Sequence, residues 1–383
     1  MNRTITVLLT VVAALVVLGL AMLGSITVAS LSGLRPVSGA DLWHPWLVKQ
    51  AAACLIGFAG LILAAALDYR RLERWVWPVY GVTLILLVLV LSPLGASVKG
   101  AQRWVFGIQP SEFAKGALVL SLAWFGARFG YRLRTFSTGV LGMGGIALPL
   151  ILLVVVEPDK GTAMLLAVVT LAVMLIAGVR WTHVLVPLFS GLVAFVLLVA
   201  SSDYARARVL AFLNPESNPT LTYQVDRALD AFGAGGLHGT GLGTGTLKFR
   251  VPEVSTDFVF PAVGEELGLP VTLAVVFAFL VVLLCGALIA HRARDPFGML
   301  IASGATFMIA AQALVNMGVV THLLPNKGMA LPFLSRGGTG TVVLLTLVGL
   351  LISVARQAGE APVPESGRAV TNPFGEADTD FPQ

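Results

Sequence analysis

Hydrophobic residues in this chain gather into long runs that polar segments separate. Ten runs approach the roughly 17–25 residues that a helix needs to cross a bilayer. They lie at 4–30, 48–67, 75–91, 111–127, 138–156, 162–179, 183–200, 267–290, 296–320 and 339–354. The longest polar interruption, residues 201–266, separates the seventh run from the eighth. This pattern predicts an all-α polytopic membrane protein with about ten transmembrane helices and one long extracytoplasmic loop between helices 7 and 8.

Composition supports this class of fold. Hydrophobic residues make up 57% of the chain and charged residues 12%, whereas soluble domains carry about 25% charged residues. Residues 1–356 therefore form a single predicted transmembrane domain. Residues 357–383, rich in Pro, Gly, Glu and Asp, are predicted to be a disordered cytoplasmic tail. The two cysteines lie inside apolar runs, which favours buried small side chains over a disulfide or a metal site.

The short loops carry unequal numbers of cations, and cytoplasmic loops retain the excess of Lys and Arg. One set of alternate loops holds Arg70, Arg71, Arg74, Arg128, Arg132, Arg134, Arg180, Arg292, Arg294 and Arg356. The opposite set holds Arg35, Lys49, Lys99, Arg103, Lys160, Lys327 and Arg336. Both termini are thus predicted to be cytoplasmic and residues 201–266 extracytoplasmic. The net charge of +5 reflects this topology rather than a nucleic-acid partner.

Acidic residues are concentrated where the long polar segment ends. Residues 251–268, VPEVSTDFVFPAVGEELG, contain Glu253, Asp257, Glu265 and Glu266, so chemistry is expected here. Asp257, between Thr256 and Phe258, is a candidate general base because a carboxylate is ionised at neutral pH and a partly apolar setting raises its basicity. The alternatives are that Asp257 holds a turn or binds a cation.

Two ionisable residues open the fourth run. Glu112 and Lys115 are three positions apart, on one face of a helix. They could mark a helix start, with Glu112 near the positive end of the helix dipole and Lys115 extending outward. Ionisable residues at this depth more often face a polar cavity, which makes both candidates for substrate binding.

Further candidates lie in the predicted outer turns. Arg103 and Trp104 form either an interface anchor or a contact to a lipid phosphate and to a sugar or prenyl chain. Asp159, which precedes Lys160, either caps the sixth helix or binds substrate. Lys327 and Arg336 are either ordinary surface charges or cations that receive an anion. With Lys115, these four cations would suit a lipid-linked, phosphate-bearing substrate.

Seven glycines fall within residues 233–245. Successive backbone amides in such a run could cradle a phosphate, although a flexible hinge has the same composition. The run lacks the Gly-Lys-Ser/Thr ending of a nucleotide-binding loop, and no nucleotide cofactor is expected.

Taken together, these motifs resemble the SEDS family of cell-wall glycosyltransferases (FtsW/RodA/SpoVE). The matching segments are Gly-x-x-Arg-Trp at 100–104, Gln-Pro-Ser-Glu-x-x-Lys at 109–115, Pro-Asp-x-Gly-Thr at 158–162, Gly-x-Gly-Leu-Gly at 239–243 and Pro-Glu-x-x-Thr-Asp-Phe at 252–258. The sequence departs from the family pattern at Glu157, where Gln is usual, and at Arg336, where Tyr is common.

The resemblance implies a peptidoglycan glycosyltransferase that polymerises lipid II at the outer face of the bacterial cytoplasmic membrane. Asp257 matches the aspartate that the family requires, and Glu253, Thr256, Glu265 and Glu266 would support its loop or a divalent ion, Mg²⁺ or Mn²⁺. A class B penicillin-binding transpeptidase is the implied partner, alongside other divisome or elongasome membrane proteins. The motifs favour the division-type FtsW branch over RodA or a sporulation relative.

Two other classes of function remain open from the sequence. A transporter or lipid II flippase would also use ten spans and a charged cavity, and its essential charges would lie near mid-membrane. A scaffold for other wall enzymes would tolerate replacement of Asp257.

Overall fold

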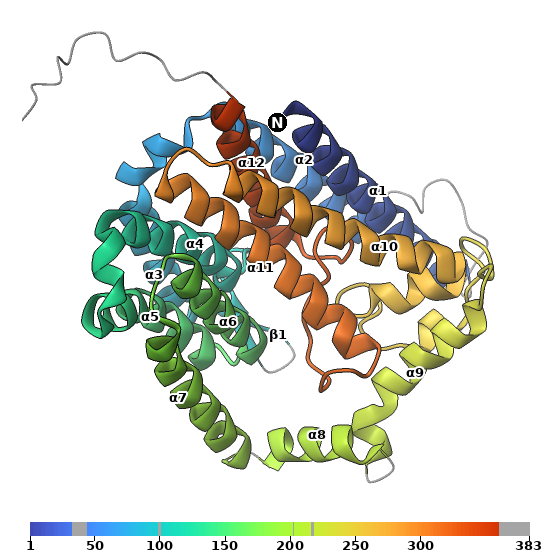
Figure 1. Ribbon diagram of the computed structural model, residues 1–383. Helices are drawn as coiled ribbons and strands as arrows, with labels where there is room; N and C mark the ends of the chain where they lie inside the picture. The colour runs from blue at the N-terminus through green and yellow to red at the C-terminus, as the bar shows by residue number, and fades with distance from the viewer. Residues whose placement is uncertain (33–43, 99–100, 202, 216–217, 360–383) are drawn as a thin grey trace, which may run out of the picture.

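Each of the ten predicted spans coincides with a helix in the computed structural model, which describes residues 1–32, 44–98, 101–201, 203–215 and 218–359. These helices are α1 (Asn2–Ser32), α2 (Pro45–Ala66), α3 (Val76–Val90), α4 (Pro110–Phe129), α5 (Met143–Val156), α6 (Lys160–Ile176), α7 (Trp181–Ala200), α10 (Val259–His291), α11 (Pro296–Val320) and α12 (Gly338–Gly359) (Figure 1). The predicted all-α polytopic membrane fold is confirmed.

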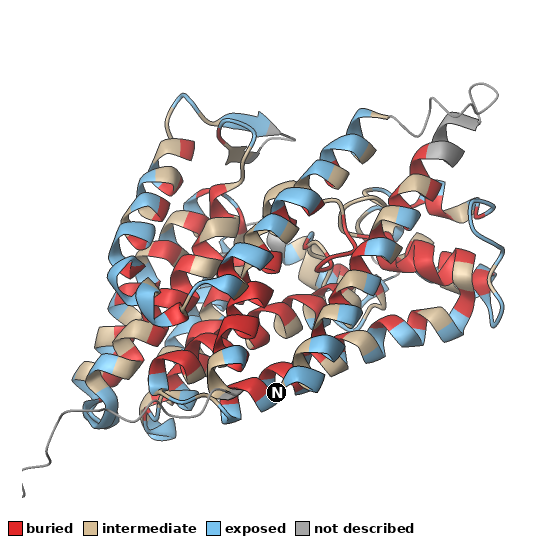
Figure 2. Cartoon of the chain, turned by 90° about the horizontal axis from the view of Figure 1, so that it is seen from above, coloured by how far each residue is buried: buried red, intermediate tan, exposed pale blue. Residues whose placement is uncertain are grey.

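The helices differ in whether they are long and apolar enough to cross a bilayer. Among the described residues, α1, α2, α5 with its preceding π-helical turn (Ser137–Gly142), α10, α11 and α12 are long and apolar enough to cross a bilayer. Helices α3, α6 and α7 are apolar but shorter. Helix α4 carries Glu112, Lys115 and Arg128, yet most of its side chains are buried by neighbouring helices. Figure 2 shows buried residues gathered in the middle of the bundle and exposed faces around it.

The long polar segment is more ordered than an extended loop. It contains α8 (Asp203–Leu213), α9 (Pro219–Gly235) and a short 3₁₀ helix, η6 (Leu247–Arg250). In Figure 1, α7, α8 and α9 follow one another along the edge of the molecule. A two-stranded hairpin, β1 (Ala96–Val98) with β2 (Ala101–Trp104), precedes α4.

Helix α10 begins at Val259, and a kink at Gly268, where φ is +74°, divides its first turns from the long apolar helix that contains Pro270. The predicted start of the eighth span, at 267, lies at this kink. Glu265 and Glu266, at the end of the predicted loop, are helical and buried. The sequence disguises this because charged residues rarely begin a buried helix unless partners elsewhere satisfy them.

Polar contacts join the helices at the end of the bundle where α1 begins and α12 ends. Tyr69 and Arg70 of η2 (Tyr69–Arg74) both hydrogen-bond to Asp295, which caps α11. Met1 and Arg356 lie at this same end, in contact with Arg292 and with the Ala65 carbonyl respectively. The chain thus enters and leaves the bundle on one side, and a cytoplasmic location for that side stays a prediction.

Some predictions fall outside the described residues. Arg35 and Lys99 of the outer loops, and residues 360–383 of the predicted tail, are among them. Residues 357–359 are not part of a tail, because they complete the last turn of α12.

Candidate functional site

Asp257 lies on a tight turn that leads directly into α10. The backbone amides of Thr256, Asp257 and Phe258 donate to the carbonyl of Glu253 at 3.0, 3.1 and 3.3 Å, and Glu253 itself has a φ of +58°. The Thr256 hydroxyl also donates to the Glu253 carboxylate at 3.0 Å. Phe258 anchors the turn by burying its ring in the bundle. Glu253 and Thr256 thus support the loop geometry, as the sequence suggested, and they leave Asp257 half-buried.

The segment between α11 and α12 wraps around this turn. Asn316, near the end of α11, donates its amide to the Asp257 carbonyl at 2.7 Å. The Asp257 carboxylate lies against Gly328, where an added Cβ would fall 2.5 Å from Oδ2. Further along, the amide of Arg336 donates to the Ser255 carbonyl at 2.8 Å. We call residues 321–337 the wrapping segment; its contacts hold the peptide units around Asp257 in place.

A buried ion pair fixes the approach to the turn. Lys248 of η6 pairs with Glu266 of α10, and their side chains are 0% exposed. The Lys248 ammonium also donates to the Ser25 hydroxyl at 2.8 Å, and Ser25 donates to Glu266 at 2.7 Å. Three segments far apart in sequence therefore meet at one charge pair. The sequence reasoning missed Lys248, because nothing local marks it as buried.

The side chain of Glu265 holds η6 through the backbone amides of that helix. Its two carboxylate oxygens accept from the amides of Leu247 and Lys248 at 2.7 and 2.6 Å. The glycine-rich run docks on α10, since the amides of Thr240 and Gly241 donate to the carbonyls of Glu265 and Glu266 at 2.9 and 3.0 Å. Glu265 and Glu266 thus anchor the loop. Two amides that could have cradled a phosphate are already occupied.

Glu112 and Lys115 form an ion pair inside the bundle. The Lys115 ammonium lies 2.7 Å from both carboxylate oxygens of Glu112 and donates to the Gln312 side-chain oxygen at 2.9 Å. Gln312 in turn donates to the Ala330 carbonyl at 2.8 Å, which links the pair to the wrapping segment. Lys115 is buried, and the Glu112 carboxylate compensates its positive charge. It is therefore not a free cation that could bind a phosphate.

Asp159 caps α6, as one reading of the sequence expected. Its carboxylate accepts from the amide and the hydroxyl of Thr162 at 3.2 and 2.9 Å. It also accepts weaker hydrogen bonds from Gln109 and Ser111, at 3.5 and 3.4 Å, at the start of α4. Asp159 therefore joins the outer ends of α4 and α6.

The charges of Asp159 and of three cations act on Lys327. We call the four cations the outer cation cluster: Arg103, Lys160, Arg208 and Lys327. Burial lowers the pKa of Lys327 to about 8; Asp159 opposes this shift, and the charges of Lys160, Arg208 and Arg103 add to it. The Arg208 guanidinium donates to the Asn326 carbonyl at 3.3 Å, which brings α8 against the wrapping segment. Lys327 precedes Gly328, the residue in contact with Asp257, so the cluster lies next to the candidate base.

Arg208 is the member that sequence reasoning did not identify. It differs from neighbouring Arg206 only in where α8 places it, so the sequence offers no local signal. Of the predicted cations, the structure brings together Arg103, Lys160 and Lys327, while Lys115 and Arg336 lie elsewhere. Trp104 ends β2, half-buried beside Arg103.

Glu157 is a buried acid beneath this cluster. It is 0% exposed, and neither carboxylate oxygen has a hydrogen-bond partner. Burial, and then the charge of Asp159, raises its pKa to about 8, while Arg103 acts in the opposite direction. Arg103 donates to the backbone carbonyls of Glu157 and Pro158. Glu157 is therefore a neutral acid at pH 7, which makes it equivalent in charge to the glutamine usual in the family.

Arg336 lies apart from the outer cation cluster. Its guanidinium is stacked 4.6 Å from the ring centre of Trp46, at the start of α2. Burial lowers the pKa of Arg336. The sequence placed Arg336 among the substrate-binding cations, and the structure gives it surroundings of its own.

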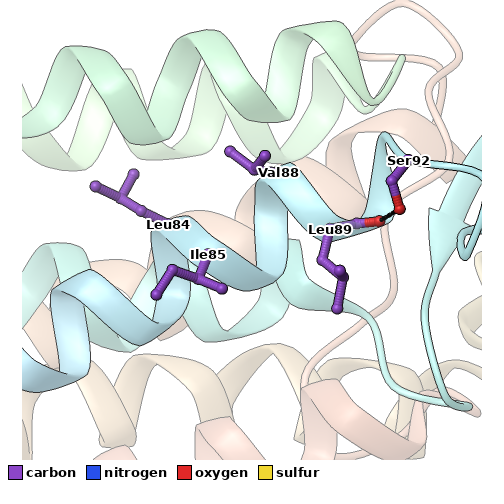
Figure 3. A pocket seen from close by; sticks show the side chains of 5 residues that line it. All are labelled: Leu84, Ile85, Val88, Leu89 and Ser92. Carbon is purple, nitrogen blue, oxygen red and sulfur yellow. Dashed lines mark hydrogen bonds between the residues drawn. The ribbon is translucent and has the colours of Figure 1, made fainter.

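Two grooves beside α3 are lined almost entirely by apolar side chains. One groove of about 340 Å³ is lined by Leu84, Ile85, Val88, Leu89 and Ser92 of α3 and its C-terminal turn (Figure 3). The Ser92 hydroxyl in this view donates to the Leu89 carbonyl at 2.6 Å. An adjoining groove of about 520 Å³ lies between α3 and α5. These surfaces suit hydrocarbon chains.

No group of three or more His, Cys, Asp and Glu residues suitable for a metal ion occurs within the described part of the chain. Mg²⁺, however, often binds through one or two carboxylates together with substrate phosphates. Asp257 beside the outer cation cluster fits that type of donor set.

Comparisons with known proteins identify the family and the fold. The sequence model of the FtsW/RodA/SpoVE family, described as a cell cycle protein, matches residues 7–360. A relative from Trichlorobacter lovleyi, named probable peptidoglycan glycosyltransferase FtsW, is 39% identical over 91% of this chain and 93% of its own length. A structure described as "Structural coordination of polymerization and crosslinking by a peptidoglycan synthase complex" superposes with a TM-score of 0.73 and 28% identity, covering 92% of this chain and 98% of that one. The rod shape determining protein RodA of Thermus thermophilus gives a TM-score of 0.65 at 26% identity, covering 92% and 97%.

The buried ion pair predicts the effect of removing one partner. Lys248→Met leaves the Glu266 carboxylate buried with the Ser25 hydroxyl as its remaining side-chain partner, and breaking such a pair costs about 3–5 kcal/mol. We expect a clear fall in the thermal unfolding midpoint, partly restored in Lys248→Met/Glu266→Gln. Lys49→Met, at an exposed site, is the control. A Lys248→Met midpoint equal to that of the control would contradict the structural role of the pair.

Glu157 predicts a pH-dependent stability difference. The pKa of Glu157 in the folded protein, about 8, exceeds its usual value of 4.5, so the proton-linked stability is fully present below pH 4.5 and is lost as the pH rises to 8. Keeping the acid neutral at pH 7 costs on the order of 3 kcal/mol. Glu157→Gln should therefore raise the unfolding midpoint at pH 8 and have little effect near pH 4.5. An equal effect at both pH values would refute the buried, neutral acid.

Proposed function

Because the chain belongs to the FtsW/RodA/SpoVE family, we propose that it polymerises a lipid-linked disaccharide into peptidoglycan strands. Relatives that are 37–39% identical over most of the chain are named peptidoglycan glycosyltransferases, and the enzyme class expected from the sequence is confirmed at this level. The chain is a multi-pass membrane protein. The FtsW names favour a role in septal wall synthesis over the elongation role of RodA.

One observation supports the reaction most directly: the carboxylate of Asp257 lies beside Gly328, one residue from Lys327 of the outer cation cluster. A base and a group of cations therefore lie within one small region. Glycosyl transfer from a lipid diphosphate needs both, since the acceptor hydroxyl loses a proton while the leaving group gains negative charge.

The reaction then follows from these positions. Asp257 accepts the proton of the acceptor hydroxyl as the hydroxyl oxygen attacks the anomeric carbon of the lipid-linked chain. The bond between that carbon and the diphosphate oxygen breaks, and its electron pair leaves with the lipid diphosphate. Attack opposite the leaving group inverts the anomeric configuration. The outer cation cluster binds the diphosphate and stabilises the charge that develops on it.

A divalent ion, Mg²⁺ or Mn²⁺, is part of the proposal. Asp257 and the substrate phosphates would hold it, and its chemistry would be to neutralise charge on the leaving group. The other acids near the turn have structural contacts: Glu265 accepts two amides, Glu266 pairs with Lys248, and Glu253 accepts from Thr256.

The orientation and the partner belong to the same proposal. The cation asymmetry of the loops supports cytoplasmic termini and an extracytoplasmic Asp257, on the side where lipid-linked rather than nucleotide sugars are the available donors. The structural relative described by the coordination of polymerization and crosslinking supports a crosslinking partner, for which we propose a class B penicillin-binding transpeptidase.

The buried Glu112–Lys115 pair supports one rival function, lipid transport, because transporters keep essential charges within the bundle. A transporter would depend on this pair and would not need Asp257. The two functions therefore separate in one experiment.

Asp257→Asn should abolish strand formation from purified lipid II by the reconstituted protein with its transpeptidase partner and Mg²⁺. Loss of a general base lowers rates by about 10²–10⁴-fold. Asp230→Asn, at an exposed ion pair on α9, should polymerise normally. Strands from a correctly folded Asp257→Asn protein would remove Asp257 as the base. The transporter would be favoured if the protein forms no strands and if disrupting the Glu112–Lys115 pair abolishes lipid transfer.

Lys327 predicts how substrate affinity changes with pH. With a pKa of about 8, it is charged below pH 8 and neutral above. The apparent KM for lipid II should therefore rise between pH 7 and 9. The measurement is cleanest in a Glu157→Gln background, since Glu157 otherwise titrates in the same range. Lys327→Arg keeps its charge and should flatten the profile; an unchanged profile would exclude Lys327 from binding.

A further inference from the structure

Arg336 has a guanidinium that the described residues do not satisfy. It is stacked on Trp46, and no hydrogen bond joins it to another described residue. Its Nη1 atom is buried and has no hydrogen-bond partner among the described residues. A buried N–H group that lacks an acceptor costs about 1–3 kcal/mol. The arrangement therefore indicates a group that is completed by a ligand.

The backbone around Arg336 is held rigidly. Its own amide donates to the Ser255 carbonyl at 2.8 Å. The buried side chain of Gln50 accepts from the Gly337 amide at 3.2 Å and donates to the Ser335 carbonyl at 3.5 Å and to the Thr341 hydroxyl at 3.2 Å. A cation fixed in this way loses little conformational entropy when it binds.

The surroundings indicate the chemistry of the ligand. A guanidinium presents its donors as a planar fork, which fits the oxygen atoms of a phosphate. Trp46 is 53% exposed at the start of a spanning helix, and tryptophans at such positions lie at the level of lipid headgroups. An anion that reaches Arg336 at that level is the phosphate of a membrane-anchored molecule.

Arg336 and Lys327 both belong to the wrapping segment, but they pack against different helices. Lys327 lies with α6 and α8, whereas Arg336 lies with α2. Between them the segment touches the turn of Asp257 at Gly328 and contacts Ser255 through Arg336.

Polymerisation joins two substrates that each carry a lipid diphosphate, and the outer cation cluster accounts for one of them. We propose that Arg336 and Trp46 form a second anion site, which binds the diphosphate of the other lipid-linked substrate beside the turn of Asp257. This assignment rests on the proposed function. It gives Arg336, which departs from the family pattern, a role of its own in this chain.

The test counts bound lipid diphosphates. Full-length protein in phosphatidylcholine nanodiscs is titrated with radiolabelled undecaprenyl diphosphate, the leaving group, which cannot turn over. We expect two molecules per chain. Arg336→Gln should weaken one of the two sites by at least about tenfold, and Lys327→Gln should weaken the other. Arg336→Lys, which keeps the charge but loses the fork, should be intermediate, and Arg74→Gln at the opposite end should bind like the wild type.

A phospholipid is the other possible source of the phosphate. The titration is therefore repeated with phosphatidylglycerol in the nanodiscs. If phosphatidylglycerol displaces undecaprenyl diphosphate from the Arg336 site, the site binds phospholipid headgroups and the substrate assignment is overturned. Two sites unaffected by Arg336→Gln, or a single site removed by Lys327→Gln, would overturn it as well.

The proposed function fails by a different result. If Asp257→Asn still polymerises while the count of bound diphosphates follows Arg336, the base is wrong and the second anion site stands. If polymerisation needs Asp257 but Arg336→Gln leaves both sites and the apparent KM unchanged, the base stands and the second anion site is wrong.

Discussion

The geometry of the turn that carries Asp257 depends on one buried ion pair, between Lys248 and Glu266. Both side chains are removed from solvent, and two charges in a low-dielectric interior are tolerated only when they are paired and hydrogen-bonded. Ser25 supplies the remaining contact from α1. Because Lys248 lies only three residues before the 251–258 turn, the pair fixes where that turn starts. Glu265 adds to this by accepting two amides of η6.

The same physical rule separates structural charges from functional ones elsewhere. Lys115 is neutralised by Glu112 and Gln312, and Asp159 is used to cap α6. Glu157, which has no partner, is kept neutral by a raised pKa. In the outer cation cluster, Asp159 raises the pKa of Lys327, while Lys160, Arg208 and Arg103 lower it. Like charges held together in this way would be stabilised by an anionic substrate.

Hydropathy was enough to predict the ten helices, because the bilayer imposes a minimum apolar length on each. Motif spacing singled out Asp257, whose role stays a prediction, and three of the four cations of the outer cation cluster. It could not find Lys248 or Arg208, whose roles arise from contacts with Ser25 and Asn326, 223 and 118 residues away in sequence. The helical turns before Gly268 were missed for a related reason, since Glu265 and Glu266 look exposed until their partners are known.

The electrostatic arrangement also favours the reaction over simple binding of the substrate. The cations of the cluster repel one another, and three of them lower the pKa of Lys327. An anion relieves this repulsion, and it does so more strongly as its charge grows. In the proposed reaction, the lipid diphosphate gains negative charge when its bond to the sugar breaks. Cations fixed by the fold would then stabilise the transition state more than the bound substrate, which is the condition for catalysis.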